Sequence, residues 1–169
     1  MSPYENRLQL DGFHRVGLVA LVPAGSEDAV RRAAAGLAIP PSGETKAGIR
    51  NLNLFTRRTS GRTFLYAYCE FDGEDPETAQ DALLESVPGF AALSPQLEPH
   101  PRAAGGARPW LRTELINIVG LRHGERPAQR ERLAVVSRLH PDREHTYRTF
   151  HQTNWPGIVD TMIRCNYRA

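Results

Sequence analysis

Three side chains that could bind and protonate a sugar recur every four residues near the end of the chain: Tyr147, His151 and Trp155. At 100° per residue they share one helix face, which continues through Ile158 and Met162. An aromatic ring can cover the apolar face of a polyol, while phenol and imidazole groups bind its hydroxyls. Histidine also exchanges protons near neutral pH. Periodicity alone favours the commoner alternative, which is a helix packed in a core.

Other candidate sites are weaker. Glu70, Asp72, Glu74 and Asp75 form an acidic cluster that is typical of a solvated turn before a helix. His140, His145 and His151 do not fall on one helical face, so we predict no metal site. The sequence contains no nucleophile elbow, P-loop or dinucleotide fingerprint. We therefore expect no bound cofactor.

The composition narrows the classes of partner. The chain has 169 residues and a net charge of only +2, which argues against nucleic-acid binding. No apolar run approaches the length of a membrane span, and the N-terminal residues lack a signal-peptide core. Cys69 and Cys165 are too few for a disulfide scaffold or a zinc site. These features predict a cytoplasmic protein without a membrane or nucleic-acid partner.

Alternation and turn signals predict the elements of the first two thirds. We expect strands at 13–22, 49–57, 63–71 and 110–119, helices at 26–37 and 75–86, and a loop through the Pro-rich stretch 88–109. The order β-α-β-β-α-β is that of an α+β, ferredoxin-like fold with both helices on one face of an antiparallel sheet. The hairpin turn is expected at 59–62.

The last third looks like the beginning of a second repeat. Residues 132–139 predict a strand, and a helix is expected from 143 to about 163, so strand, Pro turn and helix recur in the order found at 15–37. We therefore predict a complete ferredoxin-like repeat at 13–120, a linker at 121–131 and a partial second repeat at 132–169. The chain would then be a fragment or a truncated form of a tandem protein.

The C-terminal motif carries a family resemblance. Tyr147-x3-His151-x3-Trp155-Pro156, after His140-Pro141 and before Asn166-Tyr167, resembles the L-rhamnose mutarotase family over about residues 132–168. That resemblance implies a dimeric α/β barrel that interconverts the α and β anomers of a small sugar without a cofactor or metal. His151 would be the general acid, Tyr147 and Tyr167 would contact the sugar, and Trp155 matches the motif as a further binding residue.

Two alternatives remain. The first repeat faintly resembles the small cyclases of aromatic polyketide synthesis, through Gly48-Ile49-Arg50 before Leu54-Phe55 and through Pro88-Gly89-Phe90. A cyclase would need a deep apolar barrel with a few polar groups. The other alternative is a non-catalytic barrel or assembly module, favoured if His151 faces solvent or core.

The sequence also predicts a homodimer. One four-stranded sheet with helices on one side leaves its other side to be covered, and Leu52, Leu54, Phe64, Tyr66 and Tyr68 are expected there. Exposed apolar patches of that size are unusual in monomers. We therefore expect a second copy of the chain to supply the covering sheet.

Overall fold

The computed structural model describes residues 13–37, 45, 47–103, 108–114, 116, 134–153 and 156–164. The chain divides into two units, Asp11–Glu114 and a second unit made of Met1–Leu10 and Leu115–Ala169. The division falls close to the end of the first predicted repeat.

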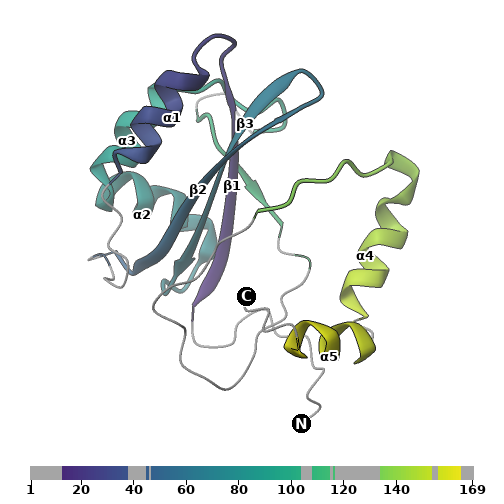
Figure 1. The fold of residues 1–169 in the computed structure, drawn as a ribbon. Helices are drawn as coiled ribbons and strands as arrows, with labels where there is room; N and C mark the ends of the chain where they lie inside the picture. Colours follow the sequence, from purple (N-terminus) through teal and green to yellow (C-terminus); the bar gives the residue numbers. More distant parts are fainter. Residues whose placement is uncertain are drawn as a thin grey trace. The chain divides into compact units, whose positions relative to one another are not determined.

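The first unit is built on a four-stranded antiparallel sheet (Figure 1). Its strands are β1 (His14–Val22), β2 (Ile49–Thr59), β3 (Arg62–Phe71) and β4 (Leu111–Thr113), in the order β2-β3-β1-β4. All neighbours in the sheet run antiparallel. The unit is thus an α+β fold compatible with the predicted ferredoxin-like topology.

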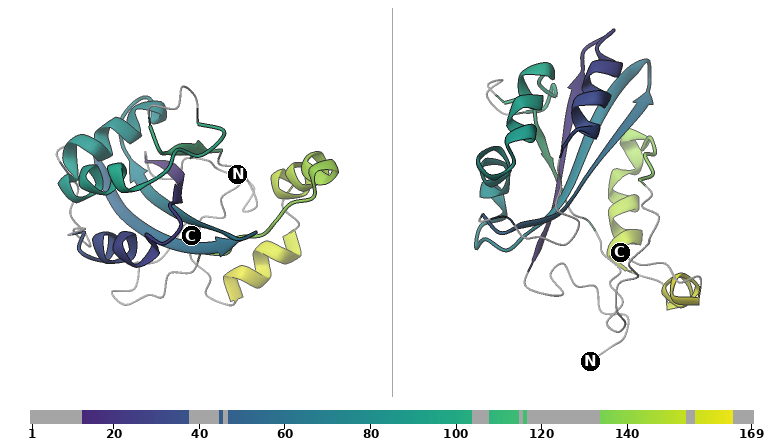
Figure 2. Two further views of the ribbon diagram at one scale, coloured as in Figure 1. Left: turned by 90° about the horizontal axis from the view of Figure 1, so that it is seen from above. Right: turned by 60° about the vertical axis from the view of Figure 1, so that its left-hand side comes forward.

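The helices of this unit cover one face of the sheet (Figure 2). They are α1 (Glu27–Ala35), the 3-10 turn η1 (Pro76–Thr78), α2 (Ala79–Ser86), α3 (Pro88–Leu93) and the 3-10 turn η2 (Ser94–Gln96). Between helices and sheet lies the core, in which alternate residues of β1 and β3 meet apolar helix residues. Its most buried members are Val16, Leu18, Val30, Ile49, Leu65, Cys69, Leu83, Phe90 and Leu93.

The Pro-rich stretch, expected to be a loop, begins with a short helix. Pro88 stands in the first turn of α3, where its missing N–H leaves no hydrogen bond unmade. This helix places Phe90 against Trp110, with ring centroids 4.8 Å apart in a stacked arrangement. Trp110 Nε1 donates to Ser94 Oγ at 3.1 Å. The burial of two aromatic rings therefore outweighs the loop-forming composition of this segment.

The β2–β3 hairpin determines which residues share a face of the sheet. Ser60 and Gly61 both have positive φ, as a two-residue type I′ turn requires, and this turn pairs Thr59 with Arg62. Following that register, Leu54 lies opposite Ala67 and faces the helices. Leu52 is likewise in the core. Our assignment of Leu52 and Leu54 to the same face as Phe64, Tyr66 and Tyr68 was therefore wrong.

The second unit departs from the predicted partial repeat. Residues 134–140 have no regular secondary structure, and Val135 is 77% exposed. The predicted strand at 132–139 is thus wrong for 134–139; residues 132 and 133 lie outside the described residues. A strand is stabilised by a neighbouring strand, and none pairs with this segment among the described residues.

The single long helix predicted after this segment is divided. The structure has a 3-10 turn η3 (Pro141–Arg143), then α4 (Glu144–Gln152) and α5 (Pro156–Arg164). Because proline cannot donate the hydrogen bond that continues a helix, Pro156 begins a new helix. The expected stripe from Tyr147 to Met162 is therefore distributed over two helices.

Candidate functional site

The face of the sheet opposite α1, α2 and α3, hereafter the second face, gathers most of the aromatic side chains of the first unit. Strand alternation and register arrange it in four rows across β1, β3 and β2. These rows are Arg15–Glu70–Arg50, Gly17–Tyr68–Asn53, Val19–Tyr66–Phe55 and Leu21–Phe64–Arg57. The second face is therefore polar at one end and aromatic along its middle.

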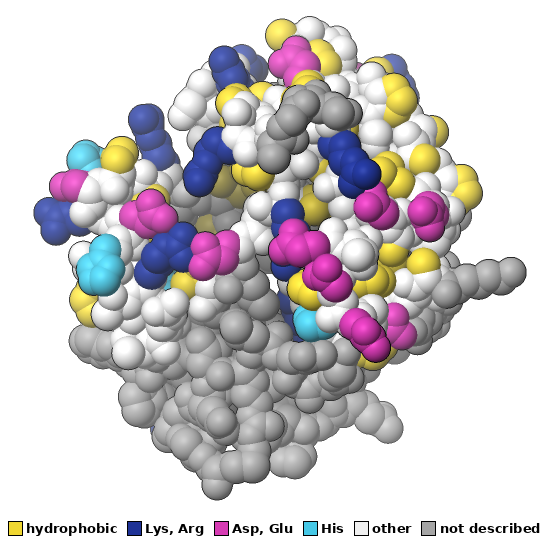
Figure 3. Space-filling view, turned by 180° about the vertical axis from the view of Figure 1, so that it is seen from behind, with side chains coloured by type: hydrophobic (Ala, Val, Ile, Leu, Met, Phe, Trp, Pro, Cys, Tyr) yellow, Lys and Arg dark blue, Asp and Glu magenta, His cyan; other side chains and the backbone are white. Residues whose placement is uncertain are grey.

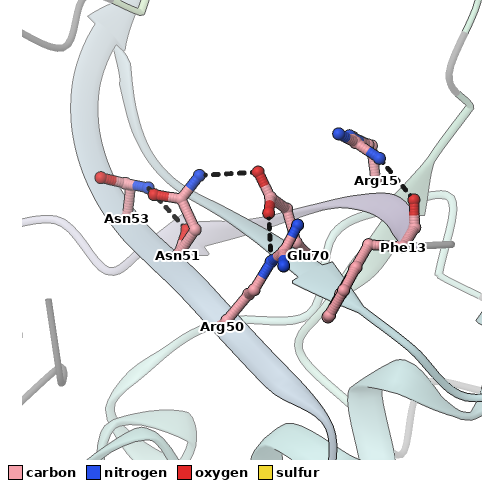
Figure 4. A network of polar contacts seen from close by, with 6 residues as sticks. All are labelled: Phe13, Arg15, Arg50, Asn51, Asn53 and Glu70. Atoms are coloured by element: carbon pink, nitrogen blue, oxygen red, sulfur yellow. Dashed lines mark hydrogen bonds and ion pairs between the residues drawn. The ribbon is translucent and has the colours of Figure 1, made fainter. Parts of the chain in front are cut away.

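A buried carboxylate organises the polar end (Figure 4). Glu70 is 1% exposed, and its two oxygens accept hydrogen bonds from Arg50 Nε at 2.6 Å and from Asn51 Nδ2 at 2.9 Å. The Arg50 guanidinium carbon also lies 3.2 Å from the centroid of the Phe13 ring, a cation–π contact. Charge and hydrogen bonding thus compensate the desolvation of Glu70 and fix the orientation of Arg50.

A β-bulge brings Asn51 into this cluster. β2 has one extra residue relative to β3 between Arg50 and Asn53, and Asn51 adopts a positive φ of 51° there. Asparagine is one of the residue types that tolerate this conformation. The side chain of Asn53 then donates to the Asn51 carbonyl at 2.6 Å. The bulge turns Asn51 toward Glu70, which regular alternation would not do.

Burial also changes the acidity of two side chains on β3. Desolvation raises the pKa of Tyr66 on the second face, so its phenol remains a neutral hydrogen-bond donor. On the core side, burial, with a smaller contribution from Glu70, raises the pKa of Cys69 to about 12. Cys69 is therefore a thiol at neutral pH and no nucleophile.

The shift at Cys69 predicts how stability depends on pH. Above pH 9 the unfolded chain loses the thiol proton, while the folded chain keeps it until about pH 12. Unfolding is then favoured, and the free energy of unfolding falls by up to about 1.4 kcal/mol per pH unit from this group. Urea denaturation between pH 8 and 11 should show this slope in the wild type and a smaller one in Cys69→Ala. Equal slopes would contradict the assignment.

The residues singled out from the C-terminal motif are only partly described. Tyr147 and His151 lie on α4 with ring centroids 4.0 Å apart, and both are exposed. His151 Nδ1 lies 2.9 Å from the Tyr147 carbonyl oxygen. Since a carbonyl only accepts, Nδ1 carries the proton and Nε2 is the basic nitrogen. Trp155 and Tyr167 lie outside the described residues.

The polar cluster of the second face was missed by sequence reasoning. The sequence predicts a solvated acidic turn for Glu70, Asp72, Glu74 and Asp75. This prediction is wrong for Glu70, which is buried, while the other three are exposed. A usable signal existed, because Glu70 continues the alternation Phe64, Tyr66, Tyr68 of the second face. The residues that pair with Glu70 on the two neighbouring strands, Arg15 on β1 and Arg50 on β2, are both basic.

The described residues include no group of three or more His, Cys, Asp or Glu side chains placed to hold a metal ion. Among the described helices, none is both long and apolar enough to cross a membrane. On the side of the molecule drawn in Figure 3, basic, acidic and hydrophobic side chains are intermingled. The described side chains on this side form no surface of a single charge sign of the kind that nucleic-acid binding would use.

Similarity to known proteins does not identify the chain. No family model matches the sequence, and no curated protein matches it. Its function must therefore be inferred from its own residues.

Proposed function

We propose that the chain is a small-molecule enzyme of the polyketide-cyclase kind, with its substrate bound against the second face of the sheet. One observation carries this proposal: half-buried aromatic rings follow β2 and β3 and end at the ordered Arg50–Glu70 pair. Apolar walls with a few oriented polar groups are typical of small-molecule sites. A flat, oxygen-rich ligand could pack on the aromatic rings and form hydrogen bonds with Arg50.

The cyclisation requires little beyond positioning and charge stabilisation. A carbon next to a carbonyl loses a proton to a solvent base, and the resulting carbanion adds to a second carbonyl carbon of the same molecule. The new alkoxide takes up a proton to become a hydroxyl group, which leaves together with a further α-proton as one water, and the ring enolises to the aromatic product. The neutral phenol of Tyr66 can donate a hydrogen bond to the oxygen that gains charge. The fixed Arg50 guanidinium can stabilise a second oxygen of the same chain.

The test uses the linear triketone heptane-2,4,6-trione, which gives orcinol with loss of one water. The wild type should accelerate orcinol formation, and Tyr66→Phe should lower that acceleration by about 10²-fold, the usual effect of removing one oxyanion donor. Product formation is followed by liquid chromatography against the uncatalysed rate.

Thr56→Val is the matched control. This substitution also removes one hydroxyl group. Thr56 lies on β2 opposite Leu65, the residue before Tyr66, so its side chain is on the helix side of the sheet. It should retain the wild-type rate. Orcinol formation at the uncatalysed rate in the wild type, or equal loss in the two variants, would contradict the proposal.

The exposure of His151 favours a non-catalytic module over a mutarotase, and the ordered pair on α4 is the observation that supports a mutarotase. We propose a sugar mutarotase as the alternative, because the Tyr147 carbonyl fixes the His151 tautomer and leaves Nε2 to exchange a proton with a ring oxygen. Tyr147, and in the resembled family Trp155 and Tyr167, would hold the sugar.

Saturation-transfer NMR of L-rhamnose distinguishes the two functions. A mutarotase would exchange anomers faster than the spontaneous rate, and His151→Ala would abolish this effect. Tyr147→Phe and Tyr167→Phe would weaken sugar binding by about 1–3 kcal/mol each. If neither the triketone nor the sugar reacts, both functions fail and a non-catalytic assembly module is left.

We also propose that a second copy of the chain covers the second face and completes a dimeric α/β barrel. Phe55, Phe64, Tyr66 and Tyr68 are all half-buried rather than buried, so a facing sheet would remove further aromatic surface from water. Sedimentation equilibrium at micromolar concentration should give twice the mass of one chain, and Phe55→Asp should shift the equilibrium toward the monomer. A wild-type monomer under these conditions would contradict the barrel.

A further inference from the structure

At the end of the second face farthest from Glu70, the ring of Phe64 is surrounded by the side chains of Leu21, Arg57 and His100. Phe64 lies between Leu21 and Arg57 in the last row of the second face. The His100 ring contacts Phe64 from outside the sheet, with centroids 6.4 Å apart and the planes tilted by 44°. An aromatic surface here is thus bordered by an imidazole and a guanidinium.

The segment that carries His100 is anchored to the sheet. Leu21 and Glu98 exchange two backbone hydrogen bonds, at 3.2 and 2.9 Å, which attach the segment to β1. The amide of His100 donates to the Pro109 carbonyl at 3.1 Å, and its carbonyl accepts from Ala103 at 2.8 Å. His100 is therefore held in place before any ligand arrives.

The proton on His100 is also positioned. The backbone N–H of Arg102 donates to His100 Nδ1 at 3.1 Å, so Nδ1 accepts and the proton of the neutral ring is on Nε2. Desolvation, followed by the nearby charge of Arg102, lowers the pKa of His100. At neutral pH the ring is thus an uncharged Nε2–H donor beside Phe64.

Arg57 and Arg58 offer a natural comparison of charge on the two faces. Both are exposed and adjacent in the chain, yet Arg57 pairs with Phe64 on the second face and Arg58 pairs with Thr63 on the helix side. The described part of the chain provides no acidic partner within ion-pair distance of either guanidinium. Of these two arginines, Arg57 is the one on the second face, in the same row as Phe64.

We propose that Phe64, His100 and Arg57 form a subsite for a planar ring that carries a negatively charged oxygen, such as a carboxylate, phenolate or enolate. The ring packs on Phe64, His100 Nε2–H donates to the oxygen, and Arg57 supplies the opposite charge. This inference rests on the proposed use of the second face, and it specifies the substrate class as an anionic aromatic or enolic compound.

The experiment compares two probes of equal shape, 2-naphthoate and 2-naphthamide, by titration calorimetry on the full chain at fixed ionic strength. The wild type should bind the anion about tenfold more tightly than the amide, as expected for a hydrogen bond to a charged group. Arg57→Gln should reduce that preference about threefold, the effect of one exposed charge. Arg58→Gln should leave it unchanged.

A second pair of variants tests the Nε2–H donor of His100 separately from the hydrogen bond between Arg102 N–H and His100 Nδ1. In His100→Asn the side-chain oxygen can still accept from Arg102 N–H, but the Nε2–H donor is gone, so affinity for both probes should fall about fivefold with little change in Tm. His100→Phe keeps a ring against Phe64 and should show the same loss if the asparagine variant does not fold.

The possible outcomes separate the subsite from the proposed function. Equal binding of the two probes by the wild type, or equal effects of Arg57→Gln and Arg58→Gln, overturns the subsite and leaves the second face as a binding surface. Wild-type affinity that both His100 variants retain overturns the donor role. Failure of the wild type to bind either probe overturns both the subsite and the proposed function.

Discussion

Glu70→Gln is expected to lower the free energy of unfolding by about 3 kcal/mol. The substitution preserves the shape of the side chain but removes the negative charge that pairs with Arg50 at 2.6 Å. Removing one member of a buried ion pair typically costs about 3–5 kcal/mol, and partial exposure of Arg50 places this pair at the lower end. Urea denaturation followed by circular dichroism measures the change.

Glu77→Gln provides the control for this prediction. Glu77 also pairs with an arginine, Arg112, but its side chain is 69% exposed, and such surface pairs contribute about 0–1 kcal/mol. Similar losses in the two variants would show that Glu70 is not the organising carboxylate of the second face.

Phe90→Ala is expected to destabilise the first unit by about 3–5 kcal/mol. Phe90 is fully buried between α3 and the sheet and stacks on Trp110, so truncation leaves a cavity that its neighbours can fill only in part. Trp110 fluorescence should shift to longer wavelength as its ring loses its neighbour, and the Tm should fall by well over 10 °C.

Ile158→Ala is the matched truncation outside this core. Ile158 is 59% exposed on α5, so its loss should change stability by less than about 0.5 kcal/mol. A comparable loss in both variants would contradict the assignment of the core to the first unit.

The sheet could be predicted because its signals are local. Short β-type runs and alternation predicted the positions of the four strands, and Ser60-Gly61 identified the hairpin turn. The strand expected at 110–119 is shorter, because β4 covers only Leu111–Thr113 and residues 110, 114 and 116 are not in a strand. The two-residue turn also determines the register, and this register places Leu54 and Phe64 on opposite faces of the sheet. Alternation within each strand, taken alone, does not relate the faces of two strands, so the assignment of both residues to one face was wrong. Helix α3 depends on the distant contact between Phe90 and Trp110, which composition does not reveal.

The site was less predictable because its key residues are far apart in the sequence. Arg50 and Glu70 meet only across paired strands, and the bulge at Asn51 has no strong sequence signal. The Tyr147–His151 pair could be predicted because residues four apart meet on a helix. The strand expected at 132–139 does not form over its described part, 134–139, because a buried strand needs a partner strand that the described residues do not supply.

Chemical-shift mapping of 2-naphthamide on the full chain tests the central claim, that ligands bind on the second face. Backbone amide ¹H–¹⁵N shifts should change along the second-face rows, at Val19, Phe64, Tyr66 and Tyr68, and these changes should be reduced in Tyr66→Ala. Shift changes confined to α4 around Tyr147 and His151, or none at saturating probe, would contradict the claim.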